Sequence, residues 1–330
     1  MKNLILKIIS FVLTLLSQYY VAKILNRDDY ASFLFFYSAS LILGLIMSLN
    51  LGRISLRELD VSNAEAKRRS ANFYMYSLLS MTVMIMIIII IYLIVLNFFP
   101  TFNNASIYVI SIMLAANLAM RFINTDCLIS IGSIRQSIYF DALLYNVILL
   151  LILYYTSNQI LVTSEVLKFM FFSITAVNIM SFFALSNALN LQKYCSLKNI
   201  LSHIALLKES IVLTLTRLIS VGINMVDVAL LTFVGGSYLI PDYGIATRFY
   251  SLFAVCLLVI NTFIPSIIKR SIHTDGKSNA INKCNAWITA MAWPVLLVGI
   301  VFTFYLDDLL KILFSNKFHI DMTYVLMIFS

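Results

Sequence analysis

The chain is poor in charged residues, in helix-breaking residues and in the side chains that bind metals. Only 12% of its 330 residues are charged, and it contains 9 glycines, 4 prolines, 4 cysteines and 3 histidines. The cysteines have no paired spacing and the histidines are isolated, so we expect no disulfide, no metal site and no cofactor. No nucleophile lies beside a base, and GGSYLIPDYG lacks the lysine and the Ser/Thr of a phosphate-binding loop. We therefore expect the protein not to be an enzyme.

Long apolar runs take up most of the sequence. Hydrophobic residues make up 61% of the chain, and the mean hydropathy is +0.94. A helix of roughly 20 apolar residues crosses a bilayer, and its backbone groups are hydrogen-bonded within the segment. We therefore predict an all-α polytopic membrane protein. Its expected transmembrane helices lie at about residues 4–25, 30–51, 71–97, 105–124, 139–156, 165–189, 209–234, 244–268, 286–305 and, incompletely, 320–330.

Lysine and arginine are concentrated in alternate connections between these segments. The N-terminus and the second, fourth, sixth and eighth connections are basic, whereas the third, fifth and seventh contain no lysine or arginine. Short cytoplasmic loops retain positive charge, so we place the N-terminus and the even-numbered connections in the cytoplasm. This bias accounts for most of the net charge of +8, which suits contact with the anionic lipids of the inner leaflet. We therefore expect no nucleic-acid partner.

The sequence repeats itself after six segments. DDYASFLFFYS at residues 28–38 aligns without a gap to PDYGIATRFYS at residues 241–251. An even number of helices between two copies gives both halves the same orientation, which predicts two parallel-repeat bundles of six and about four helices around a central cleft. We place an N-terminal six-helix lobe at residues 1–189, an amphipathic cytoplasmic linker at 190–208 and an incomplete C-terminal lobe at 209–330. The incomplete lobe leads us to expect a fragment or a truncated gene product.

Polar residues line one side of the first helix of each half. At 100° per residue, positions 0, 3, 7 and 10 fall within an arc of about 80° on a helix. Such a stripe either faces a polar cleft or holds neighbouring helices together by hydrogen bonds. Its recurrence at matching places favours the cleft. The stripes are Lys7, Ser10, Thr14 and Ser17 in the first half, and Arg217, Ser220, Asn224 and Asp227 in the second.

Charged residues in the second lobe need partners within the membrane. Helical rise places Asp227 and Arg248 near the same outer surface, so we predict an ion pair between them. Arg217 lies ten residues from Asp227, about 15 Å along the helix, so these two cannot pair. Its partner is another helix, water or a ligand, and a guanidinium suits a phosphate group. Three lysines near helix ends, Lys7, Lys23 and Lys168, are weaker candidates for the same cavity, because each can snorkel to water instead.

Several motifs, in their order and spacing, are shared with one known family. They are Asp227 in mid-helix, the outer turn Pro241-Asp242-Tyr243-Gly244, Ala246 with Arg248 one turn later, and Pro265. Two further segments add to the likeness. NRDDYASFLFFYS corresponds to the first outer turn, and LDDLLKILFSNKF to the stretch after the expected transmembrane helix at residues 286–305. With these features the chain resembles the polysaccharide-biosynthesis flippases of the multidrug, oligosaccharidyl-lipid and polysaccharide exporter superfamily. The likeness covers essentially the whole chain as a pattern, and family members usually have twelve helices or more.

The resemblance implies transport of an undecaprenyl-diphosphate-linked oligosaccharide, the repeat unit of O-antigen or a related surface polysaccharide. The flippase would move it from the inner to the outer leaflet of the bacterial cytoplasmic (inner) membrane by alternating access, as a step of lipopolysaccharide or other polysaccharide biosynthesis. A polysaccharide polymerase and chain-length proteins are candidate partners. We expect Asp227 and Arg248 to form a gate or structural ion pair. We expect the substrate to contact Arg217, Asn224, Ser220, Lys7, Ser10 and Thr14.

Other functions remain open at this stage. A cation-coupled drug exporter of the same superfamily would share the fold but should carry a carboxylate deep in the first lobe, and the first helix has Lys7 and no acid. A membrane glycosyltransferase or polysaccharide polymerase would need a substantial outer loop with catalytic residues, whereas the predicted outer connections are short and mostly uncharged. A non-catalytic scaffold or inactive truncated product is the third alternative.

Overall fold

A computed structural model describes most of the N-terminal two thirds of the chain. The described residues are 2–59, 61–98, 105–156, 161–194, 201–219, 240–245 and 247, with residues 282, 285–286, 289 and 293. The chain divides into two compact units, Met1–Val234 and Gly235–Ser330. The account below concerns the first unit.

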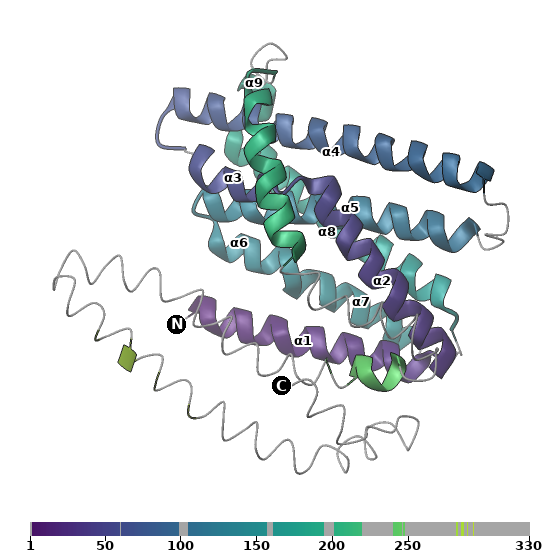
Figure 1. The fold of residues 1–330 in the computed structure, drawn as a ribbon. Helices are drawn as coiled ribbons and strands as arrows, with labels where there is room; N and C mark the ends of the chain where they lie inside the picture. Colours follow the sequence, from purple (N-terminus) through teal and green to yellow (C-terminus); the bar gives the residue numbers. More distant parts are fainter. Residues whose placement is uncertain are drawn as a thin grey trace. The chain divides into compact units, whose positions relative to one another are not determined.

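The described part of the first unit is built from helices (Figure 1). An unlabelled helix over residues 206–219 follows the labelled ones directly. The labelled elements are α1 (Lys2–Ile24), α2 (Arg27–Ser48), α3 (Leu51–Glu58), α4 (Ala64–Phe98), α5 (Ala105–Ser130), α6 (Ile134–Ile138), the π-helix η1 (Tyr139–Leu143), α7 (Leu144–Tyr155), α8 (Thr163–Leu189), α9 (Leu191–Tyr194) and the 3-10 helix η2 (Leu201–Ala205).

Five of these helical segments are long and apolar enough to cross a membrane. They are Arg27–Ser48, Ala64–Val95, Ser106–Ser130, Ile134–Tyr155 and Thr163–Leu189, and Ile9–Ile24 of α1 is a shorter apolar helix. The all-α prediction is confirmed for the described residues, and their five long apolar helices support the predicted membrane location. The repeat of two parallel bundles stays a prediction, because the helices of the second half lie outside them.

Helix α5 forms the centre of the first unit and packs against α2 on one side and α8 on another. Small residues permit the close approach of α2. A Cβ atom at Gly44 would lie 3.0 Å from the carbonyl oxygen of Ala115 and 3.1 Å from Cβ of Leu118. Ala115 and Ala119 are themselves fully buried. Membrane helices associate through such small-residue contacts, since apolar burial gives little gain in lipid.

The surface of α4 is the most lipid-like part of the first unit. From Leu79 onward its large exposed residues are all apolar, and lipid tails are the surroundings in which such residues are stable. The exposed face begins at Leu79 and continues through Val83, Met86, Ile87, Ile89, Ile90, Ile91, Leu93, Ile94 and Val95.

Alternate connections meet at the same end of the bundle. Leu25, between α1 and α2, pairs with Leu161, and the Thr163 backbone N–H and hydroxyl both donate to Asp29. At the other end, Asn50 follows α2 and bonds to the Leu213 carbonyl at 3.1 Å. The first and fifth connections therefore lie at one end and the second and sixth at the other, as an up-and-down helix bundle requires. Which end faces the cytoplasm stays a prediction.

Two predicted segments differ in detail from the structure. The predicted helix 105–124 continues to Ser130, so α5 is longer at its C-terminal end than predicted. The predicted linker 190–208 contains α9 and η2, separated by residues outside the described part. Leu191 is buried whereas Ile204 is 56% exposed, so both kinds of surface occur along it. The helix over residues 206–219 belongs to the first compact unit, and the predicted lobe boundaries stay a prediction.

Candidate functional site

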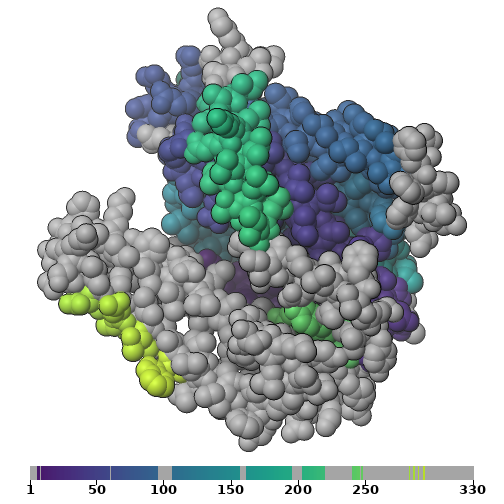
Figure 2. Space-filling model, viewed as in Figure 1, coloured from purple at the N-terminus to yellow at the C-terminus, as the bar shows by residue number. Residues whose placement is uncertain are grey.

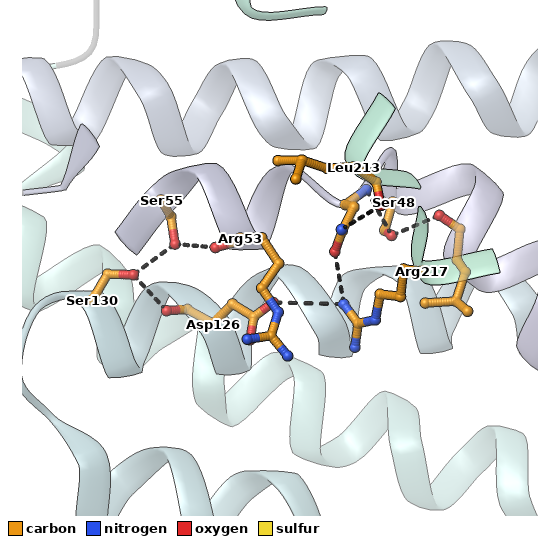
Figure 3. A network of polar contacts seen from close by, with 10 residues as sticks. Ser48, Arg53, Ser55, Asp126, Ser130, Leu213 and Arg217 are labelled. Carbon is orange, nitrogen blue, oxygen red and sulfur yellow. Dashed lines mark hydrogen bonds and ion pairs between the residues drawn. The ribbon is translucent and has the colours of Figure 1, made fainter. Parts of the chain in front are cut away.

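Arg217 lies on the helix over residues 206–219 and contacts α5 and the turn between α2 and α3 (Figure 3). Its Nη1 donates a hydrogen bond to Oδ1 of Asn50 at 2.8 Å and lies 3.8 Å from Oδ2 of Asp126. Its guanidinium carbon is 5.2 Å from the centre of the Phe122 ring, within the range of a cation–π contact. Of the partners expected for Arg217, the structure thus supplies another helix, α5, through Asp126.

Asp126 is a buried carboxylate between two arginines. The residue is 9% exposed, and its Oδ2 lies 3.8 Å from Arg217 and 4.0 Å from Nε of Arg53 on α3. These are ion-pair distances, and Oδ2 accepts no hydrogen bond from any residue that the structure describes. Figure 3 shows both arginine side chains directed toward the carboxylate. A buried charge is tolerated only with such compensation, so the arginines stabilise the ionised form of Asp126.

Local backbone geometry brings these groups together. A Cβ atom at Gly52 would lie 2.6 Å from Oδ2 and 2.7 Å from Cβ of Asp126, so only glycine allows this approach of α3 to α5. Leu49 and Asn50, with φ of 47° and 48°, adopt the left-handed conformation that separates α2 from α3. Asparagine visits this conformation more readily than most residues, and here its side-chain amide reaches the helix over residues 206–219.

Two further contacts hold the helix over residues 206–219 against α3 and the turn before it (Figure 2, green against purple). The Ser210 hydroxyl donates to the Leu49 carbonyl. Arg57 donates from Nη1 and Nη2 to the two carboxylate oxygens of Glu209, at 2.8 and 2.9 Å, and from Nε to Glu58 at 2.9 Å. The hydrogen bonds to Glu209 and Glu58 raise the pKa of Arg57, and those from Arg57 lower the pKa of Glu209. The pair is exposed to solvent, so its contribution to stability is small.

A second ion pair joins α5 to the π-helix η1. Nε of Arg121 donates to Oδ1 of Asp141 at 3.1 Å, and its Nη2 donates to the Asp141 carbonyl. The Arg121 guanidinium carbon lies 4.6 Å from the centre of the Tyr145 ring. Single π-helical turns are rare and are frequent at functional sites. The Asp141 carboxylate also acts electrostatically on three further charged residues, which are Lys7, Asp126 and Arg217.

These residues form one group, which we name the charged cluster: Lys7, Arg53, Arg121, Arg217, Asp126 and Asp141. Four cations face two carboxylates, which leaves an excess of two positive charges. The side chains of Arg53 and Asp141 are 54% and 45% exposed, so the cluster is accessible from outside the first unit. Nη1 is the only Arg217 nitrogen hydrogen-bonded to a described residue. Among membrane helices, such a cluster is suited to hold an anionic group.

The polar stripe of α1 lies against α7. Ser10 and Ser17 are each 3% exposed, and Ser10 donates to the Leu6 carbonyl. Asn146 of α7 donates to the Thr14 hydroxyl at 2.8 Å and accepts from the Ser17 hydroxyl at 2.9 Å. The opposite side of α1 exposes apolar residues, Ile9, Val12 and Leu16. The stripe therefore faces protein and not lipid, and its observed hydrogen bonds hold two helices together.

The remaining predicted site residues are only partly placed. Ser220, Asn224, Asp227 and Arg248 lie outside the described residues, so the outer ion pair and half of the second stripe stay predictions. Lys168 is exposed, as snorkelling requires.

Several residues of the site were not identified from the sequence. Arg121 lies near the end of the predicted helix 105–124, and a charge at that place is the signal that could have identified it. Asp126, Asp141 and Asn50 become recognisable only through partners that are distant in the sequence, such as Arg217. An acid within five residues of an arginine at the end of a predicted span was the available signal for Asp126.

Among the described residues, no group of three or more His, Cys, Asp or Glu side chains could hold a metal ion. No family model, curated protein or solved structure matches this chain.

Proposed function

We propose that the protein is a flippase for an undecaprenyl-diphosphate-linked oligosaccharide, moved from the inner to the outer leaflet by alternating access. The observation that supports this proposal is the charged cluster, with its four cations and two carboxylates on α1, α3, α5, η1 and the helix over residues 206–219. Charged residues between membrane helices are costly, and they usually mark the path of a polar or charged substrate.

The charged cluster lies where the head group of such a substrate would enter the protein. A sugar–diphosphate head group cannot cross hydrocarbon unaided, because every polar group would lose its hydrogen bonds to water. The cluster lies toward the end of the bundle that carries the basic connections, the predicted cytoplasmic end, where this substrate would enter. The polyprenyl tail can remain in the bilayer while the head group passes along the protein.

In this proposal Arg217 binds the diphosphate. Asn50 and Asp126 hold its Nη1, which leaves Nε and Nη2 to donate to phosphate oxygens. Arg53 adds positive charge beside Asp126 and Lys7 beside Asp141, and Ser220 and Asn224 are the further proposed substrate contacts. Ser10 and Thr14, which were also expected to contact the substrate, instead bond within α1 and to α7. The predicted pair of Asp227 and Arg248 closes the outer mouth. Polymerase and chain-length proteins are the proposed partners in the same pathway.

The test compares Arg217→Ala, Arg217→Lys and Glu209→Gln in a strain whose own flippase gene is deleted. We expect the wild type and Glu209→Gln, which alters only an exposed pair, to restore surface polysaccharide. Arg217→Lys should restore it in part, because it keeps the charge and loses the guanidinium fork. Arg217→Ala should reduce it at least tenfold at equal protein abundance. Normal polysaccharide with Arg217→Ala would contradict the proposal.

One observation favours a second candidate, a cation-coupled drug exporter. Such an exporter requires a carboxylate deep in the first lobe, and α1 contains none. Asp126 and Asp141 are carboxylates within the first six predicted membrane segments and meet this requirement. A sensitive strain expressing the wild type would then gain drug resistance, and Asp126→Asn would abolish it. Surface polysaccharide would not change in that case.

A further inference from the structure

A cavity of ≈ 740 Å³ lies at the end of the first unit that carries the even-numbered connections. Its walls come from the first turns of α4, the C-terminal residue of α3, α9, η2 and the start of the helix over residues 206–219. Arg68, Arg69 and Asn72 line one side, and Tyr194 and His203 line another. The His203 ring lies 5.7 Å from the Phe73 ring and 6.0 Å from the Tyr76 ring, which fixes this wall to α4.

The cavity offers two arginines that the described protein does not neutralise. Both Arg68 and Arg69 are exposed, and neither guanidinium forms an ion pair or hydrogen bond with a described residue. Glu58 also borders the cavity, but its carboxylate accepts a hydrogen bond from Arg57 at 2.9 Å. Glu65 remains as the one other lining carboxylate among the described residues. Two neighbouring guanidinium groups are well suited to a phosphate, which they bind with paired hydrogen bonds.

The length of α4 indicates where the cavity lies relative to the bilayer. Its 35 residues extend about 52 Å, whereas the hydrocarbon core is about 30 Å thick, so several turns lie outside it. The exposed apolar face begins at Leu79, and Arg69 precedes it by ten residues, about 15 Å along the axis. The long arginine side chains can cover part of this distance. The cavity therefore opens where the lipid head groups meet water, away from the hydrocarbon core.

We propose that this cavity binds a phosphate group through Arg68 and Arg69, and that the phosphate belongs to the head group of an anionic phospholipid. Basic pockets at the ends of membrane helices are suited to such head groups, since each arginine near the surface attracts anionic lipid. Tyr194 and Leu206 supply an apolar wall for the glycerol end of the lipid. The cavity shares no residue with the charged cluster, so the proposal does not depend on the proposed function.

The experiment uses the full chain in nanodiscs of phosphatidylcholine with a rising fraction of phosphatidylglycerol. The midpoint of thermal unfolding measures the apparent affinity for the anionic lipid. The variants are Arg68→Ala/Arg69→Ala, Glu65→Gln and, as a control, Arg135→Ala. Arg135 is exposed on α6, directly after the fourth connection, and does not line the cavity. A second arm titrates inorganic phosphate into discs of phosphatidylcholine alone.

We expect phosphatidylglycerol to raise the unfolding midpoint of the wild type and of Arg135→Ala alike. Loss of both cavity arginines should weaken the apparent affinity about tenfold or more. Glu65→Gln should strengthen it, since a carboxylate beside the phosphate is removed, and this variant tests the proposal even if the double variant does not fold.

Equal affinity in the wild type and the double variant would overturn the proposal, as would an equal loss in Arg135→Ala. Unchanged or weaker affinity in Glu65→Gln would also contradict it. Stabilisation by inorganic phosphate without any effect of phosphatidylglycerol would overturn the assignment to a lipid.

Discussion

At the scale of single residues, the account depends on Asp126. Two arginines approach one of its carboxylate oxygens, and neither comes within hydrogen-bond distance. The interaction is therefore electrostatic and can be rearranged when another anion enters. The hydrogen bond from Arg217 to Asn50 does not involve Asp126, so such an exchange does not require it to break.

Asp126→Asn should leave Arg53 and Arg217 without their shared counter-charge. We expect a loss of about 1–3 kcal/mol in the free energy of unfolding in detergent, because the partly buried cation of Arg217 would remain uncompensated. The double variant Asp126→Asn/Arg217→Gln should be destabilised by less than the sum of the single variants. Strict additivity would show that the two side chains do not interact.

Gly52→Ala tests the close approach of α3 to α5. Alanine usually stabilises a helix relative to glycine, but here its methyl group would overlap the Asp126 side chain. We expect a loss of about 1–3 kcal/mol from this overpacking, measured by thermal or chemical unfolding. The three nearest atoms all belong to Asp126, so the loss should disappear when alanine is introduced into an Asp126→Gly background. A more stable Gly52→Ala protein would contradict the structure.

The sequence predicted that Arg217 needs a partner outside its own helix, but it did not identify Asp126 as that partner. The spacing of Arg217 and Asp227 showed that Arg217 requires a partner elsewhere, since helical rise fixes their separation. The identity of that partner, Asp126, depends on a contact between residues 91 positions apart, 217 − 126. Hydrophobic periodicity describes single helices and contains no information on such pairings.

At the scale of elements, hydropathy predicted the position of the first six membrane segments well. Each of them corresponds to a helix or helical run of the first unit. The errors lie at helix ends, where polar residues lower the mean hydropathy while the helix continues, as in α5 beyond residue 124. The π-helix within 134–155 was also not predicted, because one extra residue per turn leaves the apolar pattern almost unchanged.

The contact between α1 and α7 gives an element-scale prediction. Asn146 connects Thr14 and Ser17 of α1 and is 1% exposed. We expect Asn146→Leu to destabilise the protein by about 1 kcal/mol, the typical value of such a hydrogen bond between membrane helices. Thr156→Val is the matched control, since the Thr156 hydroxyl bonds only within its own helix region. Equal effects of both variants would show that Asn146 does not join the helices.

At the scale of the whole molecule, the alternation of connections explains how one end of the bundle becomes basic. The second and sixth connections share an end, and the charged cluster and the cavity both lie toward it. A bundle with this arrangement presents cations to the head groups of one leaflet. The division of labour that we propose follows: the cavity anchors the protein to anionic lipid, and the cluster binds the diphosphate of the cargo.

The most direct measurement of the central claim is translocation in vesicles that contain only the purified chain. A fluorescent polyprenyl-diphosphate-linked saccharide is placed in both leaflets, and a membrane-impermeant reductant quenches the outer one. Without transport about half of the fluorescence persists, because the head group cannot cross the hydrocarbon. We predict that wild-type vesicles lose most of the protected half whereas Arg217→Ala vesicles retain it. Protection that is equal in wild-type, Arg217→Ala and protein-free vesicles would contradict the account.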